Sequence, residues 1–228
     1  MTSVAQRLLA VQTRITDAAK KHNRHSGDIQ LLAVSKTQPA DAVKQAARAG
    51  QKSFGENYLQ DALPKIQQLT ELGYELDWHY IGPIQSNKTR AIAEHFHWVQ
   101  SLDRLKIAQR LNEQRPDYLP PLKVCIQVNI GRESQKAGVL PEQTNALADE
   151  IMQLPRLELH GLMAIPPATA DSQQQHRAFA ELRHLFQQLP QSDKLDTLSM
   201  GMSGDMDAAI AEGSTMVRIG TAIFGPRN

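Results

Sequence analysis

The chain has 228 residues, of which 41% are hydrophobic and 21% are charged, an ordinary balance for a globular protein with a sizeable core. The formal net charge of +1 at pH 7, without any basic run, argues against nucleic acid or a membrane surface as a partner bound by bulk electrostatics. Cys125 is the only cysteine, which excludes an internal disulfide and fits a reducing, cytoplasmic location.

The first 21 residues predict an amphipathic helix. Apolar residues recur at helical spacing at Val4, Leu8, Val11 and Ile15, and they never join into the continuous apolar run of a targeting or membrane segment. We expect this helix to pack against the body of the protein.

Short apolar runs rich in β-forming residues then alternate with helical patterns to the end of the chain. Eight strands are predicted, at residues 30–35, 52–57, 77–82, 97–102, 122–130, 158–165, 196–200 and 215–220. Several, notably the run LKVCIQVNI at 122–130, are almost continuously apolar, as expected for parallel strands buried on both faces.

Helices are expected between these strands. Pro39 and Gly50 bound a helix over 40–49, and Ser86 and Asp103 are expected to cap the helices that follow them. Further helices are expected after Pro141, over 172–189 and before Gly213. This alternation predicts an α/β fold, a single (β/α)8 TIM barrel over residues 1–228 with an extra N-terminal helix. An open doubly wound sheet is disfavoured because the segment after the first strand, SKTQPA, lacks glycine.

Functional residues of such a barrel lie at the carboxyl ends of its strands. Lys36 directly follows the first strand. A desolvated lysine amine is nucleophilic toward carbonyl groups, as a Schiff-base lysine must be. The alternative is a rim lysine paired with a carboxylate such as Glu56.

The last two strands are followed by loops rich in small residues. Serines and glycines of SMGMSGDM precede a helix, and a Gly-Thr pair follows the eighth strand, where barrels often bind phosphate. Alternatively, Gly201 and Gly220 only make turns. Arg218 lies within the apolar run MVRIG and needs a buried partner, either a carboxylate such as Glu56 or an acceptor on a bound ligand.

These features resemble the pyridoxal 5′-phosphate (PLP) barrel of the alanine racemase N-terminal domain and, more closely, the YggS-type pyridoxal phosphate homeostasis family. The motifs that carry the resemblance are LLAVSK, FGENY, WHYIGPIQSNK, GLMAIP, LSMGMSGDM and GSTMVRIGTAIFG, over about residues 30–225. The resemblance implies a PLP aldimine on Lys36 and an arginine, Arg218, beside the pyridine nitrogen. It places Asn57 and Met163 in the pocket wall. The phosphate segments that it implies contain Ser199, Gly201, Met202, Ser203, Gly220 and Thr221. Lys136 matches a lysine loop used in cofactor handling or, alternatively, is a solvated loop lysine.

The resemblance implies a monomeric protein that binds PLP without catalysis, acts in PLP homeostasis and has PLP-dependent apo-enzymes as possible partners. In alanine racemase a second domain supplies an acid–base tyrosine across the dimer, and we expect no such domain after Asn228. A PLP-dependent amino-acid racemase and a cofactor-free Schiff-base aldolase remain the enzymatic alternatives. Tyr58, Tyr80, His79 and Cys125 are interpreted as structural. His95 and His97 show no metal-ligand pattern, so no metal site is expected.

Overall fold

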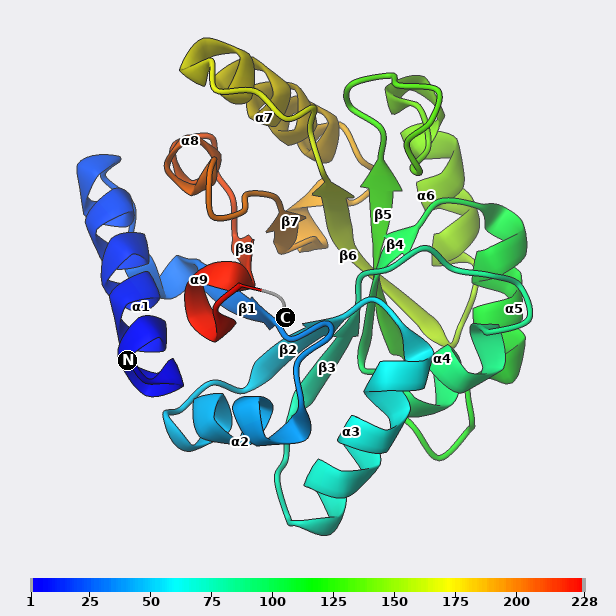
Figure 1. Ribbon diagram of the computed structural model, residues 1–228. Coiled ribbons are helices and arrows are strands. Elements are labelled where there is room, and N and C mark those ends of the chain that lie inside the picture. The colour runs from blue at the N-terminus through cyan, green and yellow to red at the C-terminus, as the bar shows by residue number, and fades with distance from the viewer. Residues whose placement is uncertain (1, 227–228) are drawn as a thin grey trace.

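The computed structural model describes residues 2–226, and its centre is a closed barrel of parallel strands (Figure 1). The strands follow chain order around the barrel, and β8 pairs with β1 to close it. Their bounds are β1 Gln30–Val34, β2 Ser53–Glu56, β3 Asp77–Tyr80, β4 Trp98–Leu102, β5 Leu122–Val128, β6 Leu157–Ala164, β7 Thr197–Ser199 and β8 Met216–Ile219. The predicted barrel is therefore confirmed, and no predicted strand end differs by more than two residues from the observed one.

Helices surround the barrel on its outside, as Figure 1 shows. Their bounds are α1 Val4–Lys21, α2 Ala40–Arg48, α3 Leu59–Glu71, α4 Thr89–His95, α5 Leu105–Gln114, α6 Thr144–Met152, α7 Ser172–Gln187, α8 Met206–Ala211 and α9 Thr221–Phe224. Short 3-10 turns lie at Ser26–Asp28, Pro141–Gln143 and Ser192–Lys194. No helix within residues 2–226 is long and apolar enough to cross a membrane.

Burial explains why these segments form strands. In β5 all residues except Lys123 and Gln127 are buried, because one face fills the barrel and the other meets the helices. Lys123 and Gln127, the two partly exposed residues, are also the two that interrupt the apolar sequence of this strand.

Two expected helix caps are wrong. The helix after Ser86 begins at Thr89, whose hydroxyl donates to the Ser86 carbonyl at 3.0 Å and so holds the intervening residues in a turn. The next helix begins at Leu105 with Arg104 at the cap position, and the Asp103 carboxylate instead pairs with Arg104 Nε at 2.9 Å.

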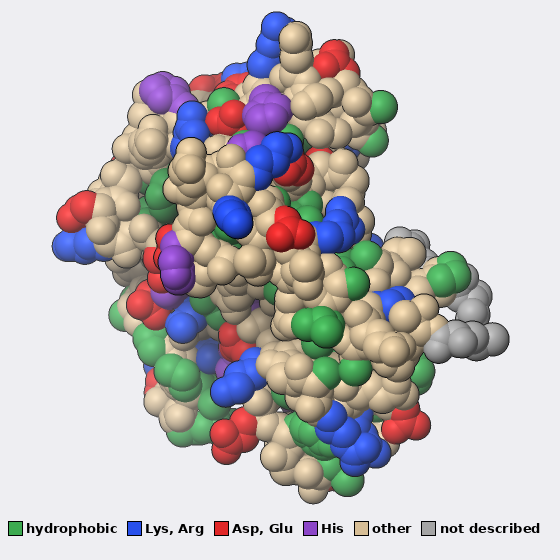
Figure 2. Space-filling view, turned by 90° about the vertical axis from the view of Figure 1, so that its left-hand side faces the viewer, with side chains coloured by type: hydrophobic (Ala, Val, Ile, Leu, Met, Phe, Trp, Pro, Cys, Tyr) green, Lys and Arg blue, Asp and Glu red, His purple; other side chains and the backbone are tan. Residues whose placement is uncertain are grey.

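The N-terminal helix α1 packs on α2, α8 and α9, which confirms its expected role. A capping box between Ser3 and Gln6 begins the helix, and the buried stripe carries Val4, Leu8, Val11, Ile15, Ala18 and Ala19. Figure 2 shows the side of the molecule on which α1 lies, where basic and acidic side chains are interspersed. This mixture matches the near-zero net charge.

Candidate functional site

A cavity of about 310 Å3 opens at the carboxyl ends of the strands, a volume at the lower end of the range for small-molecule sites. Its lining comes from the segments that follow β1, β2 and β3, from β6, from the β7–α8 loop and from β8 with the residues after it. Eight of the ten predicted binding residues lie on this lining: Lys36, Asn57, Met163, Met202, Ser203, Arg218, Gly220 and Thr221. Predicted residues as far apart in the chain as Lys36 and Thr221 thus meet in one cavity.

The other two predicted residues, Ser199 and Gly201, lie behind the cavity wall. The Ser199 hydroxyl and carbonyl both accept from Arg218, and the Gly201 carbonyl accepts from the Arg218 backbone N–H at 3.0 Å. Both residues therefore support Arg218 instead of lining the cavity. Sequence reasoning missed the lining residues Val34, Ile81, Ile165 and Gly204, although each lies within two residues of a predicted one in chain order or at a predicted strand end.

Lys36 extends from the end of β1 into the cavity lining. The next residue, Thr37, has φ 64°, a left-handed conformation that non-glycine residues rarely adopt. The backbone N–H of Gln38 donates to the Ser35 carbonyl at 3.0 Å and closes this turn. A strained backbone next to a cavity is typical of a functional site.

A buried ion pair joins β2 to α3 and contacts Ser35, the residue before Lys36. Lys65 Nζ lies 2.6 Å from Glu56 Oε1 and donates to the Ser35 carbonyl at 2.9 Å, while the Ser35 hydroxyl donates to the same carboxylate at 2.6 Å. Burial raises the pKa of Glu56, and Lys65 opposes that rise. The pair fixes the backbone immediately before Lys36. Sequence reasoning offered Glu56 as a partner for Lys36 or Arg218 and missed Lys65.

Arg218 is almost fully buried, with 5% of its surface exposed. Its NH1 donates to the Ser199 carbonyl and hydroxyl at 2.7 and 2.8 Å, and its NH2 donates to the Ala164 carbonyl at 2.8 Å. Burial lowers its pKa to about 10, so the guanidinium stays charged at neutral pH. Within residues 2–226 these bonds leave Nε and one NH2 proton without a protein acceptor, so an acceptor on a ligand fits beside it.

The β7–α8 loop approaches the cavity because Gly201 has φ +99°. A Cβ at this position would lie 2.6 Å from the Ala209 Cβ, so only glycine lets the loop pack this closely on α8. The Met202 N–H donates to Asp205 Oδ1 at 2.5 Å, which shapes the turn over the cavity. The Gly-Thr pair after β8 lines the cavity from the other side.

Lys136 lies beside this site at a second cavity of about 300 Å3, which shares Ile165, Met202 and Gly204 with the first. Its Nζ lies 2.6 Å from Glu133 Oε1 and donates to the Pro166 carbonyl at 3.2 Å. The structure thus places Lys136 next to the main cavity and not on its lining.

The other reactive side chains considered are held elsewhere. Cys125 is fully buried beside Trp98 and Met163, and burial raises the pKa of its thiol. The Tyr80 hydroxyl donates to the Pro83 carbonyl at 3.1 Å, and burial raises its pKa too. These contacts support the structural interpretation of both residues.

Comparison with known proteins gives matches over nearly the whole chain. The alanine racemase N-terminal domain family matches residues 9–228. The pyridoxal phosphate homeostasis protein of Pseudomonas aeruginosa is 58% identical over all of this chain and 97% of its own. The structure of PipY from Synechococcus elongatus with PLP bound is 36% identical, with a TM-score of 0.83 over 98% of this chain and all of the other.

Alanine racemases are more distant. The enzyme from Corynebacterium glutamicum aligns with a TM-score of 0.70 over 96% of this chain and 62% of its own, at 17% identity. At that identity the likeness shows a shared barrel fold only.

Proposed function

Since this chain belongs to the pyridoxal phosphate homeostasis protein family, we propose that it binds PLP and stores, buffers or delivers this cofactor in the cell. The proposal also gives it an influence on amino-acid and keto-acid metabolism, without catalysis of its own. The observation that carries the proposal is the meeting of Lys36 and Arg218 on one cavity of suitable size.

The residues around the cavity fit the chemical groups of PLP. Lys36 provides an amine that would bind covalently, as a Schiff base, to the aldehyde that the cofactor supplies. Arg218, an obligatory donor, would face the ring nitrogen. The β7–α8 loop and the Gly-Thr pair at Gly220 would hold the phosphate, because small residues let backbone N–H groups approach an anion.

The composition of the cavity supports binding without catalysis. Racemisation needs acid–base groups on both faces of the substrate carbon. Among the residues that the structure describes, the lining of this cavity contains no Tyr, His, Cys, Asp or Glu. An arginine beside the ring nitrogen also disfavours ring protonation and so weakens carbanion chemistry.

The proposal extends to partners and location. PLP-dependent apo-enzymes would take the cofactor at the barrel mouth, where the apolar side chains of Ile165 and Met202 are exposed. We place the protein in the cytoplasm, since its single cysteine suits a reducing compartment. We also propose that it acts as a monomer of one barrel domain.

Titration of the purified protein with PLP, followed by visible absorption, tests this function. The wild type should develop the absorption of a cofactor Schiff base, Lys36→Ala should not, and Lys52→Ala, at an exposed site, should behave as wild type. A wild type that takes up no PLP would refute the proposal. The loaded protein should also form no D-alanine from L-alanine beyond the rate of free PLP, and efficient racemisation would assign it to the enzymes.

A further inference from the structure

Three polar side chains fill the barrel interior beneath Arg218. Ser199 on β7, Gln100 on β4 and His79 on β3 each have no exposed surface. The interior of such barrels is usually packed with branched apolar side chains. Buried polar groups cost free energy unless they are paired, so their presence needs an explanation.

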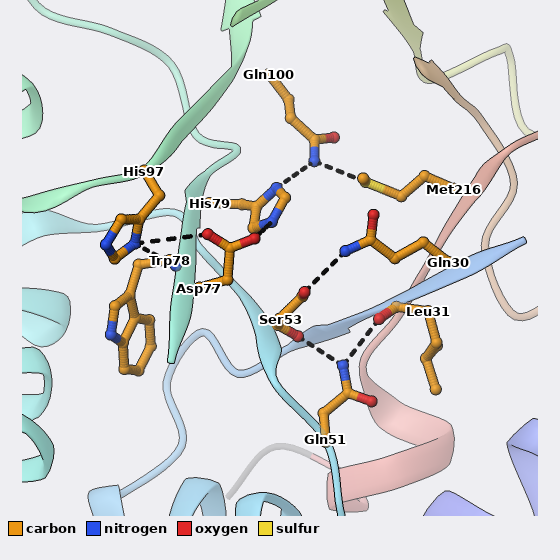
Figure 3. Close-up of polar contacts among 10 residues, drawn as sticks. All are labelled: Gln30, Leu31, Gln51, Ser53, Asp77, Trp78, His79, His97, Gln100 and Met216. Atoms are coloured by element: carbon orange, nitrogen blue, oxygen red, sulfur yellow. Dashed lines mark hydrogen bonds and ion pairs between the residues drawn. The ribbon is translucent and has the colours of Figure 1, made fainter. Parts of the chain in front are cut away.

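The three side chains form one continuous chain of hydrogen bonds. The Ser199 hydroxyl lies 2.8 Å from Arg218 NH1 and 2.6 Å from Gln100 Oε1. Gln100 Nε2 lies 2.9 Å from His79 Nδ1, and His79 Nε2 lies 3.2 Å from Asp77 Oδ2 (Figure 3). Asp77, with 37% of its side chain exposed, lines a polar cavity at the amino ends of the strands, so the chain spans the barrel.

Arg218 and the Ser199 hydroxyl together set the direction of the bonds. Arg218 can only donate, so the Ser199 oxygen accepts from it, and the single Ser199 proton is donated to Gln100 Oε1, its one acceptor within residues 2–226. The Gln100 amide nitrogen must then face His79 Nδ1, and it also donates to Met216 Sδ at 3.0 Å. Because His79 Nδ1 accepts, its Nε2 carries the proton and donates to the Asp77 carboxylate.

The surroundings of His79 agree with this neutral tautomer. Its ring stacks on Trp98, with centroids 5.1 Å apart and planes 8° apart. Burial lowers its pKa, the Asp77 carboxylate raises it in part, and the nearby His97 and Lys123 lower it further. A charged imidazole would need Nδ1 to donate, which would turn the Gln100 amide and leave the Ser199 proton without its acceptor.

We propose that Gln100 and His79 are positioning residues for Arg218, and that they hold its guanidinium with Nε and one NH2 proton turned to the ring nitrogen of PLP. In this chain of hydrogen bonds, Ser199 accepts both NH1 protons of Arg218. Within residues 2–226 no carboxylate contacts the Arg218 cation directly, so the aligned acceptor groups are what stabilises its charge. This inference rests on the proposed PLP-binding function and names residues that the cavity lining does not contain.

The first test uses the protein without cofactor and reads the histidine directly. In ¹⁵N-labelled protein, NMR of His79 should show a neutral ring protonated at Nε2 near neutral pH. In Gln100→Glu a carboxylate oxygen replaces the amide nitrogen that faces His79 Nδ1. The His79 ring should then become cationic, because Nδ1 needs a proton to donate to that oxygen. A wild-type His79 that is protonated at Nδ1, or a ring unchanged in Gln100→Glu, would overturn the directed chain.

The second test measures the cofactor. Gln100→Leu should weaken PLP binding by up to about tenfold, the upper end of the effect of one hydrogen bond between neutral groups, and shift the visible absorption of bound PLP. The matched control is Gln51→Leu, because Gln51 is also buried, bonds the Leu31 and Ser53 carbonyls and lies outside this chain of hydrogen bonds (Figure 3).

The control should lose stability and keep the wild-type spectrum and affinity. A wild type that binds PLP while Gln100→Leu binds it equally well with an unchanged spectrum would overturn the positioning role alone. A wild type that binds no PLP would refute the proposed function and this inference with it.

Discussion

Replacing Lys65 with methionine removes one partner of the buried ion pair behind Lys36 and keeps a side chain of similar length. The side chains of Lys65 and Glu56 are 4% and 0% exposed, and their charged atoms lie 2.6 Å apart. Leaving one buried charge without its partner costs roughly 3–5 kcal/mol of unfolding free energy. At this chain length each kcal/mol corresponds to a fall of about 2–4 °C in Tm.

Acid should partly restore the Lys65→Met variant. Burial already raises the pKa of Glu56, and Lys65 is the main group that opposes the rise. Without Lys65 the folded protein binds a proton on Glu56 at a pH where the unfolded chain does not. The folded state then binds more protons, so the unfolding free energy of the variant rises, relative to wild type, as the pH falls from neutral toward the ordinary pKa of glutamate.

Urea unfolding at several pH values measures both effects. The control is the double variant Glu56→Gln/Lys65→Met, which removes the whole charge pair and should recover most of the loss, without the acid-dependent gain. PLP uptake by the single variant should also weaken, because Lys65 holds the Ser35 carbonyl just before Lys36. A loss below about 1 kcal/mol, or a loss that does not change with pH, would refute the reasoning.

Gly201→Ala should lower the unfolding free energy by about 2–4 kcal/mol, because of its φ of +99° and the 2.6 Å approach to Ala209. Gly204→Ala, with no atom within 4 Å of the added Cβ, should change it by less than about 0.5 kcal/mol, and equal losses in urea unfolding would contradict this account. The buried Cys125 thiol, whose pKa burial raises, should react with Ellman's reagent only after unfolding; rapid reaction of the native protein would show that it is accessible. Burial lowers the pKa of His79, so below the ordinary histidine pKa of about 6.5 the unfolded chain binds more protons at this site than the folded protein. The unfolding free energy of the wild type should therefore decrease as the pH is lowered, by at most about 1.4 kcal/mol per pH unit from this site. Stability measured from about pH 7 to about pH 5 should fall less in His79→Phe, and identical slopes would exclude the effect.

The barrel could be predicted because its strands are marked locally. The apolar run at 122–130 and the Pro39–Gly50 pair each depend on near neighbours in the chain, and both are where the structure has a strand and a helix. Helix caps were less predictable. Ser86 has the side chain of a cap, but its carbonyl accepts from the Thr89 hydroxyl three residues later, and the helix begins only at Thr89.

The candidate site could be predicted in part. Position at strand ends and the family resemblance identified Lys36 and Arg218, which the structure places on one cavity. The supporting residues could not be found in this way. Lys65 is one lysine of an amphipathic helix, and Gln100 lies within a predicted strand, so nothing in the sequence indicates that the one pairs with Glu56 and the other with Ser199. Such pairings depend on the closed barrel, which brings distant segments together.

Locating the covalent attachment of PLP tests the central claim most directly. The wild-type protein is loaded with PLP, reduced with borohydride to make the Schiff base permanent, digested and mapped by mass spectrometry. The account predicts the phosphopyridoxyl group on Lys36, with Lys36→Ala unlabelled under the same conditions. Attachment chiefly at another residue, such as Lys136, or no attachment at all, would contradict it.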